Sequence, residues 1–421
     1  MRESLGFLMK IITLLGLLML LFFGSPATSA QSWMQIPITT NRWSSMACSA
    51  DARKLFACAG GGQPFTAITP CLVYFSTNSG STWLESGAPS NHWSSIASSA
   101  DGNKVIAAVG SSSRSGGIYT SIDGGQNWAS NNIPARQWRS VTSSADGSKL
   151  YALTFNGELY STSDSGMTWH SNSAPQRAWT IASSADGTKL IAAPGSSGGY
   201  LCTSSDSGAT WLTNTSISPR VWWTVASSAD GRVLAAVDGN GGPFGKVFTS
   251  TNYGVVWVTN ALPALSWQYV ALSADGEKII AAAWYSSGVP AGPIYTSTNT
   301  GLTWISNAIP NLVWQGVTCS ADGNKLLAIS AGKTNTSTVG QGEIWVAHAS
   351  QLPILQITLT NGAVLCWTVP STSFNLQQTS NLMTPDWSDM TNAPTLNLVN
   401  LQNQVSLPIT ASNRFYRLKG Y

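Results

Sequence analysis

Few acidic side chains in this 421-residue chain are free to do hydrolytic chemistry. Hydrolysis of a glycosidic bond normally needs two carboxylates, one on each side of the bond that breaks. Most of the 18 Asp and Glu residues fall in repeated turn sequences. The acids that remain as weak catalytic candidates, in connections of three different repeats, are Glu158, Asp238 and Glu343. The alternative interpretation is that they are solvated loop acids.

No residue pattern indicates metal, cofactor or phosphate chemistry. The histidines His92, His170 and His348 are scattered, and none has the H-x-x-H or H-E-x-x-H spacing of a metal site. No glycine-rich phosphate loop lies between a strand and a helix. We therefore expect neither a metal nor a cofactor.

A repeated tryptophan with a basic residue beside it is the candidate binding feature. The tryptophans expected to begin the inner strand of each repeat are Trp43, Trp93, Trp138, Trp179, Trp222, Trp267 and Trp314. One or two residues before the first five lie Arg42, His92, Arg136, Arg177 and Arg220. Arginine binds carboxylates through paired hydrogen bonds, and indole faces attract cations. The competing interpretation is that the tryptophans pack between repeats and the basic residues keep the protein soluble.

The composition excludes several classes of protein. Charged residues make up only 9% of the chain, hydrophobic residues 43%, and the formal net charge is +3. A disordered chain has few apolar residues and a high net charge. A nucleic-acid binder needs a clustered basic face, and the chain has no long block of like charge. We therefore expect a folded protein that does not bind nucleic acid.

The elements that position these residues come from a sequence repeat. The phrase Ser-Ala-Asp recurs seven times at intervals of 40 to 50 residues. Its aspartates are Asp51, Asp101, Asp146, Asp186, Asp230, Asp275 and Asp322. Each interval contains short runs of Val, Ile, Leu, Ala and Tyr, separated by Gly, Asn, Ser and Asp, with no helical period. A period of this length with four short strands per unit predicts an all-β, seven-bladed β-propeller.

A second turn recurs in six of the units. Blade 4 has Ser204-Ser205-Asp206-Ser207-Gly208-Ala209-Thr210-Trp211. The position of Asp206 is held across the six copies by Asn78, Asp123, Asp164, Asp206, Asn252 and Asn299. Asp and Asn accept hydrogen bonds from turn amides, and glycine supplies a positive φ. We therefore interpret these side chains as turn-forming residues rather than ligands or catalysts.

This second motif, S-x-D-x-G-x-T-W, resembles the Asp-box of BNR-type β-propellers over residues 31 to about 350. The resemblance implies a propeller fold and leaves the activity open, because the family includes sialidases, xyloglucanases, non-catalytic receptors and a photosystem II assembly factor. A sialidase would also need an arginine triad and a Tyr–Glu pair, and the chain has no R-I-P motif.

The two ends of the chain differ from the repeat. Blade 7 lacks the second turn, and Trp33 resembles the tryptophan that begins an outer strand. We expect residues 32–37 to be the outer strand of blade 7 and to close the ring, which removes exposed sheet edges. Residues 351–421 contain no copy of the repeat, and their short strand-like runs predict a small β-module. It resembles C-terminal modules of secreted proteins from environmental bacteria.

Residues 1–30 have the features of a secretory signal peptide. Arg2 and Lys10 precede the apolar segment 11–23, and small residues follow it up to Ala30. We expect a secreted protein, periplasmic or extracellular, without stable membrane insertion after cleavage. Export would permit disulfides, and the spacing of Cys48, Cys58 and Cys71 allows one local bridge.

The sequence thus predicts a monomeric, non-catalytic binding scaffold. Its ligand would be an extracellular glycan or protein at the face that carries the channel mouth. The b–c connections of the blades vary in length at this face, and variable loops on a rigid scaffold usually carry binding. Two alternatives stay open: a glycoside hydrolase of the sialidase or xyloglucanase kind, and an assembly or stability factor for a membrane complex.

Overall fold

The computed structural model of the 421-residue chain divides into two compact units, which we describe separately. The larger unit spans Ala30–Gln351 with Asn397–Leu401, and the smaller contains Leu352–Leu396 and Gln402–Tyr421. The residues that the structure describes are 32–38, 42–60, 71–111, 114–175, 177–195, 198–239, 245–285, 292–331 and 342–348, and then 356–359, 363–368, 374–380, 386–390, 395–397, 402–407 and 415–420. The expected signal peptide lies outside them.

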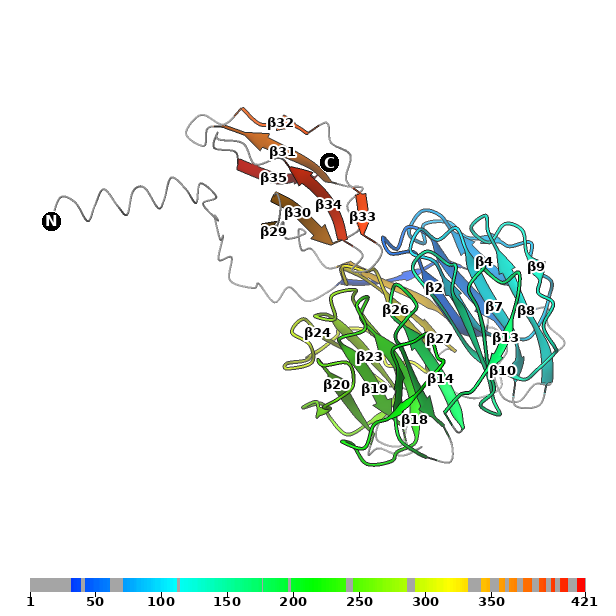
Figure 1. Ribbon diagram of the computed structural model, residues 1–421. Coiled ribbons are helices and arrows are strands. Elements are labelled where there is room, and N and C mark those ends of the chain that lie inside the picture. Colours follow the sequence, from blue (N-terminus) through cyan, green and yellow to red (C-terminus); the bar gives the residue numbers. More distant parts are fainter. Residues whose placement is uncertain are drawn as a thin grey trace. The chain divides into compact units, whose positions relative to one another are not determined.

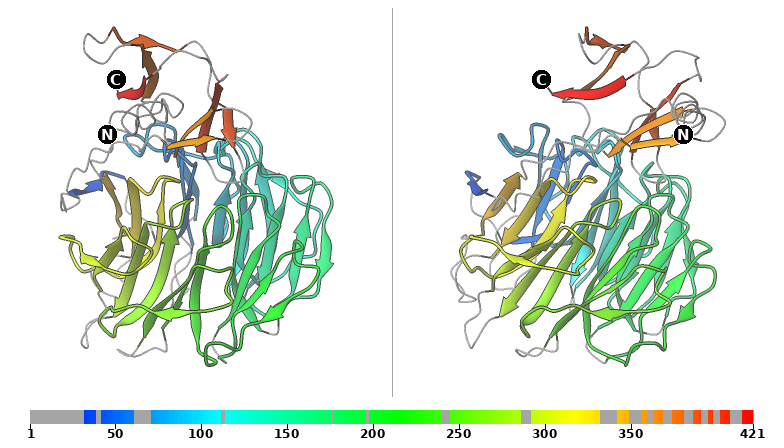
Figure 2. Two further views of the ribbon diagram at one scale, coloured as in Figure 1. Left: turned by 60° about the vertical axis from the view of Figure 1, so that its left-hand side comes forward. Right: turned by 90° about the vertical axis from the view of Figure 1, so that its left-hand side faces the viewer.

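The larger unit consists of seven four-stranded antiparallel sheets, which makes it a seven-bladed β-propeller (Figure 1). In both views of Figure 2 these sheets stand side by side around a common axis. The predicted fold class is therefore confirmed. We name the strands of each blade a to d, from the channel outward.

The first four blades have the following strands. Blade 1 contains β2 (Trp43–Cys48), β3 (Leu55–Ala59), β4 (Val73–Ser76) and β5 (Leu84–Glu85). Blade 2 contains β6 (Trp93–Ser98), β7 (Val105–Ser111), β8 (Arg114–Ser121) and β9 (Ala129–Ser130). Blade 3 contains β10 (Trp138–Ser143), β11 (Leu150–Thr154), β12 (Leu159–Thr162) and β13 (His170–Asn172). Blade 4 contains β14 (Ala178–Ser183), β15 (Leu190–Pro194), β16 (Cys202–Ser204) and β17 (Leu212–Thr213).

The last three blades follow the same order. Blade 5 contains β18 (Trp222–Ser227), β19 (Leu234–Asp238), β20 (Lys246–Ser250) and β21 (Val258–Thr259). Blade 6 contains β22 (Ser266–Leu272), β23 (Ile279–Tyr285), β24 (Ile294–Ser297) and β25 (Ile305–Ser306). Blade 7 contains β26 (Trp314–Cys319), β27 (Lys325–Ser330), β28 (Ile344–His348) and, as its outer strand, β1 (Ser32–Ile36).

The ring is closed by β1, as the sequence predicted. This strand pairs with β28 in an antiparallel register in which Trp33 lies opposite Ala347. The Trp33 Nε1 atom donates a hydrogen bond to Asn307 Oδ1 of blade 6 at 3.1 Å. The indole of Trp169, in the second turn of blade 3, makes the same bond to Asn131 of blade 2. Trp33 therefore takes the place of a second-turn tryptophan that blade 7 lacks.

The Ser-Ala-Asp phrase builds the turn between strands a and b and joins the blades. In blade 3 the Asp146 carboxylate accepts hydrogen bonds from Ser144 Oγ at 2.5 Å and from the Ser148 amide at 2.9 Å. The middle alanine of each phrase donates its amide to the alanine carbonyl of the next blade, at 2.7 to 2.8 Å. The alanines in this circle are Ala50, Ala100, Ala145, Ala185, Ala229, Ala274 and Ala321, and Ala321 donates to Ala50.

The second turn, between strands c and d, holds its Asp or Asn in a local hydrogen-bond network. In blade 3 the Asp164 carboxylate accepts bonds from Thr162 Oγ1 at 2.6 Å, the Thr168 amide at 2.9 Å and Thr168 Oγ1 at 2.6 Å. These donors lower the pKa of Asp164 well below its usual value. Gly166 has φ +98°, which explains the glycine at this position. The carboxylate is therefore engaged within its own turn.

The smaller unit contains two antiparallel sheets. One has the order β29 (Gln356–Leu359), β30 (Ala363–Thr368), β34 (Gln402–Leu407) and β33 (Thr395–Asn397). The other has the order β32 (Ser388–Asp389), β31 (Phe374–Thr379) and β35 (Phe415–Gly420). Its core contains the buried side chains of Leu365, Leu376, Val405 and Leu407. Among the described residues of the whole chain, no helix is long and apolar enough to cross a membrane.

Candidate binding face

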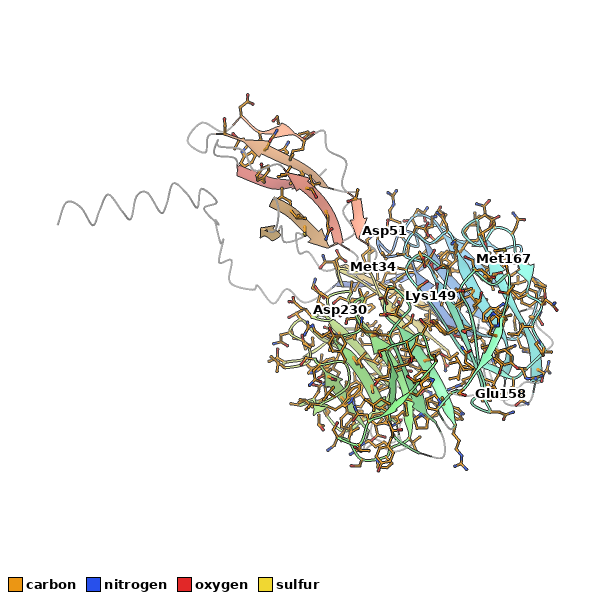
Figure 3. The ribbon with its side chains drawn as sticks, viewed as in Figure 1. Met34, Asp51, Lys149, Glu158, Met167 and Asp230 are labelled. Atoms are coloured by element: carbon orange, nitrogen blue, oxygen red, sulfur yellow. The ribbon has the colours of Figure 1, made fainter. Side chains whose placement is uncertain are left out.

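The b–c and d–a connections lie together at one face of the propeller, which we call the loop face. The two recurring turns, a–b and c–d, lie at the opposite ends of the same strands, because the strands of each blade are antiparallel. Figure 3 labels Glu158 at the loop face and Asp51 in an a–b turn, well apart from each other. All the candidate site residues from the sequence, except the turn-forming Asp and Asn residues, fall at the loop face or just below it.

Each of the three candidate catalytic acids already forms a hydrogen bond or an ion pair with a neighbouring side chain. Glu158 accepts a hydrogen bond from Arg136 Nε at 3.1 Å in a solvent-exposed ion pair. Glu343 accepts a hydrogen bond from Trp345 Nε1 at 2.7 Å. The third acid, Asp238, is described below. The three belong to blades 3, 7 and 5 respectively, and each has a partner other than the remaining two acids.

The ion pair of Arg220 with Asp238 is the more buried of the two at this face. Arg220 Nη1 lies 2.8 Å from Asp238 Oδ2, and Asp238 is only 4% exposed. The guanidinium also lies over the Phe248 ring, with its carbon 5.0 Å from the ring centroid. Because the Arg holds the carboxylate and the aromatic ring covers the Arg, Asp238 is poorly placed to reach a substrate.

The basic residues beside the repeated tryptophans occupy two positions rather than one. The carbonyls of Arg42, His92 and Arg177 accept hydrogen bonds from backbone amides in or just after the last residues of strand b in the same blades. Arg136 and Arg220 lie one residue earlier and pair instead with Gly116 and Gly199 of the preceding blades. All five basic residues lie at the loop face, and two of them, Arg136 and Arg220, form ion pairs with Glu158 and Asp238.

The ring of tryptophans needs a correction in two respects. In six blades an indole at the start of strand a is fully buried: Trp43, Trp93, Trp138, Trp222, Trp267 and Trp314. A side chain with no exposed surface cannot stack on a ligand, so the four of these proposed for binding, Trp43, Trp93, Trp138 and Trp222, are packing residues. In blade 4 the equivalent position belongs to Ala178, which pairs with Pro194, and Trp179 is the bulged residue that follows it.

Sequence reasoning missed Arg139, which occupies the bulge position in blade 3. Its guanidinium carbon lies 5.1 Å from the Phe155 ring centroid and 4.7 Å from that of Trp179. Burial lowers the pKa of Arg139, and Tyr269 of blade 6 interacts with it electrostatically. Blades 3 and 6 face each other across the channel, so Arg139 projects into it. Its stacking partners come from a loop and from the next blade, which no local pattern in the sequence reveals.

The loop face is the more basic of the two faces. Its described residues include seven Arg and Lys residues, namely Arg42, Arg114, Arg136, Arg139, Arg177, Arg220 and Lys246, against three acids. The turn face carries the Asp residues of both recurring turns. Many of its lysines bridge neighbouring blades there, as Lys325 Nζ does to Asp51 O at 3.1 Å. The distribution of charge therefore favours an acidic partner at the loop face.

The local disulfide that the spacing of Cys48, Cys58 and Cys71 allowed is not formed, because the thiols of Cys48 and Cys58 are free. Cys48 lies opposite Leu55 at the turn end of its hairpin, whereas Cys58 lies opposite Ser45 toward the loop end. Burial raises the pKa of Cys48 to about 11 and that of Cys58 to about 12. Among the described residues, no group of three or more His, Cys, Asp or Glu side chains could hold a metal ion.

Comparison with known proteins gives a fold and no family. No protein-family model matches the chain. No curated protein matches it either. Many solved structures do match, among them YCF48 bound to D1 peptide, at 15% identity and a TM-score of 0.54, covering 77% of this chain and 96% of that one. YCF48 from Cyanidioschyzon merolae gives 15% identity and a TM-score of 0.55, covering 75% and 98%.

A GH74 xyloglucanase from Xanthomonas campestris is similar to the same extent. It gives 14% identity and a TM-score of 0.58, covering 80% of this chain and 59% of that one. The likeness is one of fold. A peptide-bound propeller and a glycoside hydrolase are both similar to this chain in fold, so the likeness does not indicate an activity.

Proposed function

We propose that this protein is a secreted, non-catalytic binding scaffold of the BNR/Asp-box propeller kind, whose loop face binds an acidic glycan or protein. The observation that carries the proposal is that all three candidate acids at the loop face already have hydrogen-bond or ion-pair partners. Glu158 and Asp238 are ion-paired with Arg136 and Arg220, and Glu343 is hydrogen-bonded to Trp345. A glycosidase needs two carboxylates within about 5 to 10 Å of each other across the substrate, one of them free to give or take a proton.

Further support comes from the remaining charge of this face. After Arg136 and Arg220 are paired, Arg42, Arg139 and Arg177 still add positive charge around the channel mouth. The second-turn networks support membership of the Asp-box group, since six copies share one arrangement around Asp or Asn. The N-terminal segment 1–30 supports export, and the protein would then act outside the cytoplasm as a monomer.

An assembly factor for a membrane complex is the second candidate. The peptide-bound YCF48 structure favours it, because that propeller is matched over 96% of its length and holds a protein segment. A protein partner would suit the basic loop face as well as an acidic glycan does. The two candidates differ in the ligand rather than in the face that binds it.

The test combines a binding screen with an activity screen on purified protein spanning residues 31–421. A glycan array and a hydrolysis assay would be run together, with a co-purification from membranes. Binding without turnover supports the scaffold, turnover supports a glycoside hydrolase, and a co-purifying membrane protein alone supports the assembly factor.

The loop face is then tested with a double variant, Arg42→Ala and Arg177→Ala, which removes positive charge and leaves the ion pairs of Arg136 and Arg220 in place. We expect an intact fold and weaker binding of the acidic ligand, with a larger loss at low salt than at high salt. Unchanged binding in this variant would remove these arginines from the site and direct attention to the long connections of blades 1 and 7.

A further inference from the structure

Blade 4 lacks a pair of aromatic rings that five of the other blades contain. In blades 1, 2, 3, 5 and 6 the buried tryptophan of strand a meets an aromatic ring of strand c edge to face, with centroids 5.3 to 5.7 Å apart. In blade 3 these rings are Trp138 and Tyr160. In blade 4 the matching positions are Ala178 and Cys202, since Cys202 pairs with Ala192 as Tyr160 pairs with Ala152.

A hollow of about 500 Å³ lies beside these two positions. Its lining includes Pro194, which is the strand-b partner of Ala178, and Cys202 itself. Pro175, Tyr200 and Trp211 complete the apolar wall, and Tyr200 is 38% exposed at its opening. A volume of this size lies within the range of pockets that bind small organic groups.

The hollow has one cationic side chain, Arg177, at its rim. Arg177 is exposed, and among the described residues it makes no ion pair. Arg136 and Arg220, by contrast, are neutralised by acids of their own. An apolar, ring-lined hollow with an unpaired guanidinium beside it is complementary to an aromatic ring that carries a nearby carboxylate.

We propose that this hollow binds one aromatic side chain of a protein partner, and that an adjacent carboxylate of the partner contacts Arg177. This inference rests on the proposed binding function and specifies the chemistry of one contact at the loop face. The propeller itself shows the fit, because five other blades fill the equivalent space with an indole and a second aromatic ring. The partner's ring would take the place of the missing indole.

The experiment titrates purified protein that contains both units with N-acetyl-tryptophan and with its neutral amide, by isothermal calorimetry. We expect the acid to bind about tenfold more tightly than the amide, since a charge-assisted hydrogen bond to Arg177 is lost in the amide. Arg177→Gln should remove this preference. Arg53→Gln is the control, because Arg53 is exposed in the a–b turn of blade 1, at the opposite face, and it should change neither affinity.

Filling the hollow gives the second arm. Ala178→Trp restores the missing indole and should abolish binding of both probes. If this variant does not fold, Cys202→Phe fills the other half of the pair and should have the same effect, with the melting temperature checked in each case. Probe binding that survives both substitutions would overturn the proposal. The proposal would also be overturned if methyl glucoside bound to the protein while the tryptophan probes did not, and if Ala178→Trp prevented that glucoside binding.

The two proposals fail differently. If the double arginine variant weakens ligand binding while Ala178→Trp leaves it unchanged, the proposal for the hollow is wrong and the binding function stands. If no ligand depends on the loop face, yet the tryptophan probes bind wild-type protein and not Ala178→Trp, the hollow stands and the broader function is wrong.

Discussion

Truncating one buried tryptophan should cost a large part of the propeller's stability. Trp138 of blade 3 has no exposed surface. Its ring lies 5.3 Å from that of Tyr160, and its Nε1 donates to the Gly116 carbonyl of blade 2 at 2.8 Å. Trp138→Ala would remove a contact between two blades as well as a filled volume. Truncation of a buried tryptophan to alanine costs about 3 to 5 kcal/mol.

Loss of the hydrogen bond to Gly116 adds little to this free-energy cost. The Gly116 carbonyl also accepts the Arg136 amide at 3.0 Å, so it keeps a partner when the indole is removed. We therefore expect a loss of about 4 kcal/mol in the free energy of unfolding, within the range for a cavity without an orphaned acceptor.

The measurement is equilibrium unfolding in urea, with the slope of the transition compared between wild type and variant. Leu302→Ala is the control, because Leu302 is 78% exposed and its truncation should change stability by about 0.5 kcal/mol or less. A loss below about 1 kcal/mol for Trp138→Ala, with an unchanged slope, would refute the view that these indoles hold neighbouring blades together.

Three further predictions follow from the closure, the second turn and the thiols. Deleting residues 32–36 should expose the edge of β28 and cause aggregation or a large fall in melting temperature, and a deletion variant that melts like wild type would show that β1 does not close the ring. The lowered pKa of Asp164 means that its stabilisation is present above its ordinary pKa of 3.8 and is lost as the pH falls through the lowered value. Asp164→Asn should accordingly lose less stability than wild type between about pH 5 and pH 2 in acid unfolding curves, whereas parallel curves would contradict the turn network. Because burial raises the pKa of Cys48 to about 11 and of Cys58 to about 12, both should resist iodoacetamide at about pH 8 until urea unfolds the protein, and rapid labelling of either in native protein, read by mass spectrometry, would count against their burial.

The sequence was sufficient for the features that recur. The seven Ser-Ala-Asp turns and the six second turns each use a side chain that bonds to its own turn, so local spacing predicts them. The closing strand could be predicted because Trp33 resembles a tryptophan that blade 7 lacks. In each case the information lies within a few residues or in the comparison of one repeat with another.

The sequence did not predict the contacts that join residues of different loops and strands. Arg177-Ala178-Trp179 resembles Arg220-Val221-Trp222, and the bulge that places Ala178 rather than Trp179 in the core is fixed by pairing with Pro194. The pairing of Arg220 with Asp238 joins a d–a connection to the end of strand b, and loops of unequal length hide that proximity. The sequence therefore shows which charged residues these segments contain, while the partners of those residues come only from the structure.

The pairing of β1 with β28 also governs the order of events during synthesis. Ser32 lies opposite His348, so β1, which is made before the other strands of the propeller, has no partner until more than 300 further residues have been made. During that interval blade 1 can assemble its own four strands, but the circle of alanine amides cannot close, because Ala50 provides the acceptor for Ala321. Contacts between such distant residues form slowly, and an unpaired strand invites mispairing with other chains. A nascent chain of this protein would therefore benefit from a chaperone that covers its early strand until blade 7 emerges.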